Sequence, residues 1–550
     1  MGATALGLAA VVGGGPGTPV ALGAGSPDYP AADSGYTSYA ELTAEIHQLA
    51  DAHPDLVAVR SIGRSAQGRP IWIVKISDNV ADPVEPGEPE VLFDALHHAR
   101  EHLTVEMAMS IIHLLVDHHG DPDALGRRVT AIVDGTVTWV VPMLNPDGWA
   151  YDVGAPASRR RYGPDGSHFY AGWRKNRQAI PGSRQVGVDL NRSWGYDWGC
   201  CRGSSGSPAS ETYRGPRPWS APEVRALRDF VKSRVIGGQQ RITEHVTWHT
   251  TGQQILWPYG HTYADVPRDM TALDHRTFVA LGRAMAALNG YRAMQSSDLY
   301  PTDGDEIDWM YGTQRIFSFT FEMYPAAGSS GSTDRFYPPD SLIDRETSRN
   351  RGAVLYLLEH AGCVYGAIGR AAAYCGPLYD DFETGRGWTR DPAGTDTATA
   401  GGWGRGRPAR SSHQRRRAWS GQSLLVTGRG RNVDVDGGTT TARSPLVTIP
   451  ADAAAHLHLR AWVGLDARAG AGDGLTIRLV DESGAVIGDP LLVVAGDGTD
   501  HPPTWRSVSV ALPPASAGQR VAVQLEATDD PSDGDATVET GVDDVRITLD

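Results

Sequence analysis

The chain has 550 residues, too many for one ordinary domain, so two or three domains are expected. Its 40% hydrophobic and 21% charged residues are typical of a folded soluble protein, and the net charge of -15 argues against nucleic acid as a partner. Since no apolar run approaches the roughly 20 residues that span a bilayer, the sequence predicts no membrane-spanning segment and no membrane partner.

The N-terminus and the cysteines bear on where the protein acts. Residues 1–32 are rich in Gly, Ala and Pro and are predicted to form a disordered leader. Residues 3–12 resemble the remnant of a secretory signal, although the basic segment that precedes such a signal is missing. The four cysteines are Cys200, Cys201, Cys363 and Cys375. The last two could close a small loop, the pairing of the first two stays open, and an even count favours a secreted, extracellular protein.

From residue 33 onward, apolar runs rich in β-branched residues alternate with stretches of helical period. The predicted strands are 71–76, 91–96, 136–143, 242–248 and 316–323, and the predicted helices are 39–52, 101–118, 222–235, 272–289 and 341–361. This alternation is typical of an α/β domain in which helices flank a mixed central sheet. We expect this domain to span residues 33–365, with a linker at 366–379.

The C-terminal part, residues 380–550, has no helical periodicity, and short alternating runs separated by Gly, Pro and Asp replace it. The clearest runs are 456–462, 475–479 and 521–525. They predict an all-β, jelly-roll-like sandwich. If its first and last strands pair, the acidic residues at 380–383 and 543–544 could form a calcium (Ca2+) site, with solvated acidic turns as the alternative.

Three polar residues stand at the ends of predicted strands, where open α/β sheets bind their ligands: His98, His249 and Glu322. Glu101 follows His98 by three residues as a strand gives way to a helix, so both side chains can reach one metal ion. His98 and His102 form a rival pair on one helix face. A buried histidine or a solvated acid would explain each residue alone, but the three positions together indicate a metal site.

Longer motifs occur in a fixed order over residues 33–362. They are His98-Ala-Arg-Glu101, Asn145-Pro-Asp-Gly148, Trp173-Arg-Lys-Asn-Arg177, Val188-Asp-Leu-Asn-Arg-Ser-Trp194, Ser210-Glu-Thr-Tyr-Arg-Gly215, Trp257-Pro-Tyr-Gly260, Ile307-Asp-Trp309 and Ser318-Phe-Thr-Phe-Glu322. On these motifs the chain resembles the zinc carboxypeptidases of the carboxypeptidase A type, with the bacterial carboxypeptidase T group closest.

The resemblance implies one zinc ion (Zn2+) per catalytic domain, bound by His98, Glu101 and His249 with water in the fourth position. This two-histidine, one-glutamate set is the known one of carboxypeptidase A. The resemblance also implies that Glu322 is the general base and that Arg174 stabilises the oxyanion. Asp189 would orient the imidazole of His98.

Further positions match the part of the family's site that holds the substrate. Asn191 and Arg192 would clamp the free carboxylate, because a guanidinium fork fits a carboxylate in bidentate fashion. Tyr300 would close over the C-terminal residue, and Arg100 would contact the substrate further from the cut. Without the resemblance, an ordinary turn would explain Asn191 and Arg192, and a solvated basic patch would explain Arg174.

The resemblance also bears on specificity. Ile307 would lie at the floor of the pocket for the C-terminal side chain, which favours apolar residues. Two acids lie in the loop around Tyr300: Asp298, two residues before it, and Asp305 in Thr302-Asp-Gly-Asp305. Of these, Asp298 could meet a Lys or Arg side chain, because a buried cation needs a partner. The expected specificity is mixed, apolar first and basic second, with acidic C-termini poor.

The sequence thus predicts a secreted zinc metallocarboxypeptidase, a monomer that hydrolyses the C-terminal peptide bond of peptides and proteins. Two other interpretations stay open. One is an inactive relative that presents the sandwich as a binding domain, which the intact ligands, base and clamp disfavour. The other is an enzyme for cell-wall peptides, although the clamp fits ordinary peptide C-termini at least as well.

Overall fold

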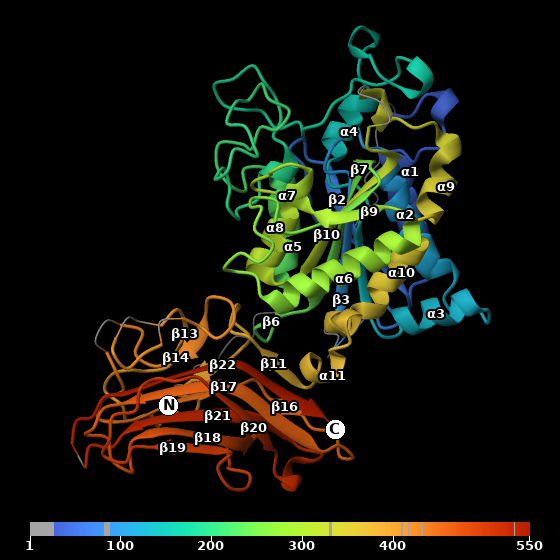
Figure 1. Cartoon of the computed structure of the whole chain (residues 1–550). Coiled ribbons are helices and arrows are strands. Elements are labelled where there is room, and N and C mark those ends of the chain that lie inside the picture. Colours follow the sequence, from blue (N-terminus) through green and yellow to red (C-terminus); the bar gives the residue numbers. More distant parts are fainter. Residues whose placement is uncertain are drawn as a thin grey trace, which may run out of the picture.

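The structure is a computed structural model that describes residues 27–81, 88–328, 333–408, 411–415, 417–430, 433–532 and 534–549. It contains an α/β domain and, below it in Figure 1, an all-β domain. The predicted fold class, a mixed sheet flanked by helices followed by an all-β region, is confirmed.

The α/β domain is built on an eight-stranded sheet in the order β1-β2-β4-β3-β7-β10-β8-β9. Its strands are β1 (Val57–Arg64), β2 (Pro70–Ile76), β3 (Glu90–Ala95), β4 (Val137–Val141), β7 (Ile242–Gly252), β8 (Gln254–Trp257), β9 (Arg292–Gln295) and β10 (Phe317–Ala326). The four central strands β4, β3, β7 and β10 are parallel, whereas β2 and β8 join them antiparallel. A separate hairpin comprises β5 (Val235–Ile236) and β6 (Gln239–Gln240).

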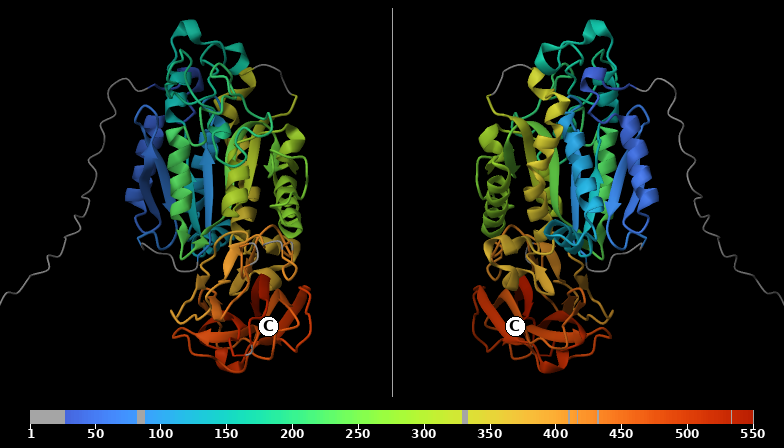
Figure 2. Two further views of the ribbon diagram at one scale, coloured as in Figure 1. Left: turned by 90° about the vertical axis from the view of Figure 1, so that its left-hand side faces the viewer. Right: turned by 90° about the vertical axis from the view of Figure 1, so that its right-hand side faces the viewer.

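Helices cover both faces of the sheet (Figure 2). They are α1 (Tyr39–Ala52), α2 (Leu103–Asp117), α3 (Ala124–Val133), α4 (Pro146–Val153), α5 (Pro222–Ser233), α6 (Ala272–Asn289), α7 (Ser296–Leu299), α8 (Glu306–Gln314), α9 (Ile343–Ser348), α10 (Arg351–His360) and α11 (Ala371–Tyr374). Helices α2, α6 and α10 belong to the apolar core on one face, and α5 and α8 to the core on the other. The central strands are therefore buried on both sides, and their carboxyl ends meet at one edge.

Part of the expected leader is built into this domain. Residues 1–26 lie outside the described residues, but Tyr29 is buried and accepts a hydrogen bond from Trp149 Nε1 at 2.8 Å. Tyr170 donates to the buried carboxylate of Asp33. The chain thus packs against the α/β domain from residue 29.

The C-terminal domain packs two six-stranded sheets against each other around its own core. One sheet has the order β13-β14-β22-β17-β20, and β11 also pairs with β22. The other sheet has the order β12-β15-β21-β18-β19, and β16 also pairs with β21. The strands are β11 (Leu378–Asp380), β12 (Thr389–Arg390), β13 (Gly404–Gly406), β14 (Leu424–Val426), β15 (Gly438–Arg443), β16 (Val447–Thr448), β17 (Ala455–Leu465), β18 (Gly474–Asp481), β19 (Leu492–Ala495), β20 (Arg506–Ala511), β21 (Arg520–Asp529) and β22 (Val538–Leu549). Helix α11 and most of β11 fall within residues 366–379, where the sequence predicts a linker.

Two further findings bear on the sequence-based expectations. Cys200 is bonded to Cys201 and Cys363 to Cys375, so all four cysteines form disulfides. Within the described part of the chain, no helix combines the length and apolar character needed to cross a membrane.

Candidate active site

Two parallel strands bring the predicted metal ligands together at the carboxyl edge of the sheet. Ala95 at the end of β3 lies opposite Trp248 of β7, so His98 and His249 follow at the same level. Leu96 has a φ of 56°, a left-handed backbone conformation that turns the chain between β3 and His98.

The three side chains are almost fully buried and direct their polar atoms at one another. His98 Nδ1 lies 2.8 Å from Glu101 Oε1, and His249 Nδ1 lies 3.0 Å from Glu101 Oε2. The two Nδ1 atoms are 3.1 Å apart. These residues form one of the groups that are close enough to hold a metal ion.

The contacts fit a bound cation. His98 turns its other nitrogen, Nε2, toward Asp189 Oδ1 at 3.1 Å, which places the proton on Nε2 and leaves the Nδ1 lone pair facing the cluster. Burial lowers the pKa of His249 to about 4, so this imidazole is neutral near pH 7. Two imidazole lone pairs and a carboxylate converge here, which is a donor set that catalytic zinc accepts.

Asp189 also holds the predicted oxyanion residue. Arg174 donates from Nε and Nη2 to Asp189 Oδ2 at 3.1 and 3.0 Å. Burial disfavours the charged form of Arg174, but the negative charges of Asp189 and Glu101 outweigh this effect and raise the pKa of the guanidinium. Asp189 Oδ1 additionally accepts from the backbone N–H of Asn191 at 3.0 Å. One buried carboxylate thus connects a metal ligand, a cation and the predicted clamp.

Glu322 lies directly opposite His249 in the pairing of β10 with β7. Burial raises the pKa of Glu322 to about 8, and the nearby negative charge of Glu101 adds to the effect. A cation held by the neighbouring cluster would oppose this shift, because it stabilises the carboxylate form.

A small cavity of about 30 Å³ joins Glu322 to the predicted substrate residues. Its lining consists of Asn191, Arg192, Leu256, Ser296, Leu299, Tyr300, Thr302, Asp305, Ile307, Thr320 and Glu322. Tyr300 is 50% exposed, whereas Arg192 and Ile307 are buried. The guanidinium of Arg192 is held by the carbonyl of Gly203, to which Nε donates at 3.2 Å.

Besides Glu322, the acid that lines this cavity is Asp305, whereas the sequence analysis assigned the contact with basic side chains to Asp298. Asp298 is exposed and is not among the lining residues. Asp305 is buried and accepts from the backbone N–H of Asp308, which caps α8. Burial, together with the neighbouring Asp308, raises the pKa of Asp305 to about 7. In the sequence, Asp305 occupies an N-cap position two residues before Ile307, and this pattern predicts a helix start at the pocket.

Two other predicted residues lie beside the metal cluster. Arg100 donates to Glu211 Oε2 at 3.0 Å and stacks over the ring of Phe336, and it does not line the cavity described above. His102, the rival ligand, contacts Asp152 Oδ2 at 3.1 Å and packs against Tyr337. It therefore packs among the buried rings of Tyr29, Tyr170 and Tyr337 and lies outside the metal cluster.

The calcium expectation finds no support. Strands β11 and β22 do pair, as it requires. However, Glu383 accepts from two backbone N–H groups at 2.7 Å and pairs with Arg315 at 3.0 Å. Asp543 likewise accepts from two backbone N–H groups. Among the described residues, the groups able to hold a metal ion lie in the α/β domain.

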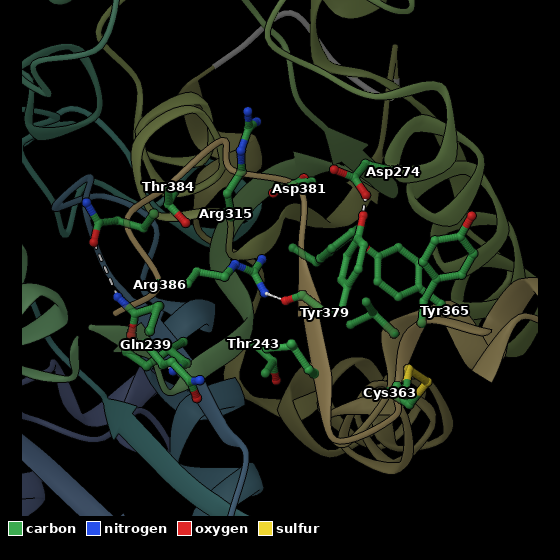
Figure 3. Close-up of a pocket in the computed structure, with 18 of the residues that line it drawn as sticks. Gln239, Thr243, Asp274, Arg315, Cys363, Tyr365, Tyr379, Asp381, Thr384 and Arg386 are labelled. Atoms are coloured by element: carbon green, nitrogen blue, oxygen red, sulfur yellow. Dashed lines mark hydrogen bonds between the residues drawn. A yellow bond between two sulfur atoms is a disulfide. The ribbon is translucent and has the colours of Figure 1, made fainter. Parts of the chain in front are cut away.

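A larger cavity of about 460 Å³ lies at the opposite end of the sheet, between the two domains (Figure 3). Its walls include Thr243 at the start of β7 and Tyr379 of β11. Arg386 donates to the carbonyl of Tyr379 at 3.1 Å, and Tyr365 donates to Asp274 at 2.8 Å. The predicted site residues line the smaller cavity instead.

Comparisons with known proteins agree with this site. The sequence model of the family described as zinc carboxypeptidase matches residues 42–353. A zinc carboxypeptidase of Saccharothrix mutabilis subsp. capreolus is 45% identical over 346 residues, which cover 63% of this chain and 74% of the relative. Carboxypeptidase A1 of Rattus norvegicus is 32% identical over 333 residues, 59% of this chain and 70% of the relative. The crystal structure of thrombin activatable fibrinolysis inhibitor aligns with a TM-score of 0.50 at 25% identity, over 59% of this chain and 74% of that one.

The mixed sheet with a buried two-histidine, one-glutamate cluster at its carboxyl edge defines an α/β protein with a candidate metal centre. More particularly, the chain belongs to the zinc carboxypeptidase family. It is a metallocarboxypeptidase, and the predicted resemblance to the carboxypeptidase A type is confirmed.

Proposed function

We propose that this metallocarboxypeptidase removes C-terminal residues from peptides and proteins, with His98, Glu101 and His249 as zinc ligands and Glu322 as general base. The observation that carries the proposal is one shared cavity. Glu322 and Tyr300 line it together with Asn191 and Arg192, and Glu322 pairs with His249 across the two strands. A base, a carboxylate clamp and a metal cluster are thus contiguous.

The chain's own groups divide the chemistry among them. Zinc, when bound, supplies a Lewis acid that polarises the scissile carbonyl and activates water. Glu322 takes the proton that the water loses and passes it to the leaving amine. Arg174, kept cationic by Asp189, stabilises the charge that develops on the carbonyl oxygen, a contribution of about 3 kcal/mol in comparable sites.

The clamp supports exopeptidase rather than endopeptidase activity. Arg192 is a buried cation within the cavity, and Asn191 lies beside it. Together they suit the negatively charged end of a peptide, because charge-assisted hydrogen bonds are strong in a dry site. The half-exposed ring of Tyr300 is placed to close over the terminal residue.

The lining of the cavity supports mixed specificity. Leu256, Leu299 and Ile307 present apolar surface to the C-terminal side chain, which favours residues such as Phe and Leu. Asp305 offers a carboxyl group for a Lys or Arg, so basic ends come second. Acidic ends would meet this same carboxyl and are expected to be poor.

We also propose that the protein is secreted. The support is that all four cysteines form disulfides, and disulfides persist mainly in oxidising, extracellular compartments.

Paired peptides test the proposed function. One member ends in a free carboxylate and the other in an amide, with the same sequence, and release of the C-terminal residue is followed by mass spectrometry. We expect cleavage of the free peptide only, and its loss when a zinc chelator is added and recovery with zinc. Equal cleavage of both peptides, or cleavage at internal bonds, would contradict the clamp.

A further inference from the structure

Strand β7 places a row of polar side chains beneath the metal cluster. Because side chains alternate along a strand, His245, Thr247 and His249 lie on the same face. His249 directs Nδ1 into the cluster, so when a metal ion takes that nitrogen the ring proton is on Nε2. This N–H is buried and needs an acceptor.

Two groups lie near Nε2 of His249. Thr247 Oγ1 is 3.3 Å away, and Asn191 Nδ2 is 3.5 Å away. The amide of Asn191 cannot be turned over, because its Oδ1 accepts from the backbone N–H of Glu306 at 3.0 Å. Its nitrogen is a donor and cannot accept a proton from an imidazole. Of these two neighbours, the Thr247 hydroxyl is therefore the acceptor.

The hydroxyl of Thr247 lies beside a buried carboxylate. Asp94 is fully buried and lies directly opposite Thr247 in the pairing of β3 with β7. His245 Nε2 lies 2.6 Å from Asp94 Oδ2, and His97 Nδ1 lies 3.3 Å from Asp94 Oδ1. Burial favours the neutral form of Asp94, but the two histidines outweigh it and lower its pKa. Thr247 Oγ1 also lies 3.3 Å from His97 Nδ1, so the hydroxyl stands between two imidazoles, with Asp94 beside His97.

Asp94, His97 and Glu306 are also close enough together to be considered as a second metal site. The orientation of His97 argues against that interpretation. His97 directs Nδ1 to Asp94 at 3.3 Å and Nε2 to Glu306 Oε2 at 3.0 Å, so the two carboxyl groups lie at different nitrogens of one ring. A single ion cannot bind both nitrogens of one imidazole, so one ion could not take the place of both contacts.

We propose that Thr247 is a positioning residue: its hydroxyl accepts the Nε2–H of His249 and so fixes the orientation of the second metal-binding imidazole. The arrangement parallels the contact of Asp189 with His98, with a hydroxyl in place of the carboxylate. This inference rests on the proposed function, in which His249 binds zinc. Removing such support typically weakens metal binding about 10–100-fold.

The test compares three variants, Thr247→Val, Thr247→Ser and Thr250→Val. Valine keeps the shape of threonine but removes the hydroxyl, and serine restores the hydroxyl. Thr250 is the matched control, because it is a buried threonine adjacent to His249 whose Oγ1 has no hydrogen-bond partner in the described part of the chain. Zinc affinity is measured on each full-length apoprotein by competition with a chelator, and cobalt spectra report the ligand geometry.

We expect Thr247→Val to weaken zinc binding about 10–100-fold and to change the cobalt spectrum, while the other two variants stay within about threefold of wild type. Unchanged thermal unfolding of the apoprotein shows that the valine variant folds. Wild-type affinity in Thr247→Val, or equal losses in Thr247→Val and Thr250→Val, would overturn the proposal. So would a second zinc ion per chain that Thr247→Val or His97→Phe removes. The paired-peptide assay on wild type tests the proposed function separately, because it does not depend on these affinities.

Discussion

The two imidazoles of the metal cluster are supported in different ways. The Nε2 atom of His98 faces the carboxylate of Asp189, whereas the Nε2 atom of His249 faces the hydroxyl of Thr247. Glu322 completes the group from the neighbouring strand. At the scale of single residues, Asp189, Thr247 and Glu322 can each be changed without removing a proposed metal ligand.

Glu322→Gln separates metal binding from catalysis. The amide preserves the shape of the side chain but cannot take a proton, so we expect kcat to fall about 10²–10⁴-fold. Zinc content, measured by elemental analysis, should stay at one ion per chain, since Glu322 is not in the ligand cluster. A variant with near wild-type kcat would show that another group is the base.

Asp305→Asn tests which acid sets the response to basic C-termini. We expect kcat/KM for peptides ending in Arg to fall about tenfold, because a cation in the pocket loses its partner. Peptides ending in Phe should change little, since they pack on Leu256 and Ile307. Asp298→Asn is the matched control and should have no effect, because Asp298 is exposed and outside the cavity. The reverse ranking of the two variants would return the role to Asp298.

The sequence predicted the metal cluster better than the groups that surround it. His98 and His249 stand at strand ends, and parallel strands bring such ends together whatever their separation in the chain. Asp305 and Asp298 cannot be distinguished by their distance from Tyr300 along the chain, since only the N-cap geometry turns Asp305 inward. The two-residue period of β7 predicts that Thr247 lies on the same face as His249. However, a threonine in a buried strand has no sequence pattern that marks a functional role.

At the scale of elements, buried central strands were predictable and edge elements were not. β3 and β4 are covered on both faces and are mostly apolar, whereas the buried strand β7 mixes apolar and polar residues. The edge strand β1 is mostly half-buried or exposed, and β9 has only four residues, so neither has a clear pattern. Helix α8 was also missed, because it is short and its buried residues do not follow a single helical stripe.

Helix α2 carries an ionisable group whose titration should affect stability. Glu106 accepts from the backbone N–H of Thr37 at 2.7 Å and from its hydroxyl at 2.9 Å, and burial raises its pKa to about 7. The folded state therefore holds this proton more tightly than the unfolded state, whose pKa is near 4.5. The associated stability is complete below pH 4.5 and is lost as the pH rises through about 7.

Glu106→Gln removes this titration while keeping an acceptor for the Thr37 N–H. We expect wild type to lose stability relative to the variant between pH 5 and pH 8.5, by at most about 3 kcal/mol. Denaturant unfolding of both proteins at the two pH values measures the difference. A stability gap that does not change with pH would show that Glu106 keeps an ordinary pKa in the folded state.

At the scale of the whole molecule, the active site and the sandwich lie at opposite ends of the central sheet. The catalytic cavity is at the carboxyl ends of β7 and β10, and the inter-domain cavity of Figure 3 is at their starts. Across the domain boundary, Arg315 pairs with Glu383 at 3.0 Å, and both side chains are buried. Because Arg315 follows α8 directly, this pair connects the sandwich to the helix whose first turn carries Ile307.

A chain ending at residue 376 tests whether the catalytic domain is independent. It keeps the Cys363–Cys375 disulfide and every residue of the catalytic cavity, so we expect it to fold with kcat/KM within about threefold of the full chain. In the truncated chain, Arg315 lacks Glu383 but becomes exposed to water, so we expect the loss of this ion pair to cost little stability. In the full chain, by contrast, Glu383→Ala leaves Arg315 buried without its partner and should destabilise the protein by about 3–5 kcal/mol. Denaturant unfolding and peptide hydrolysis measure both proteins, and an insoluble or inactive truncated chain would show that the sandwich is part of the catalytic fold.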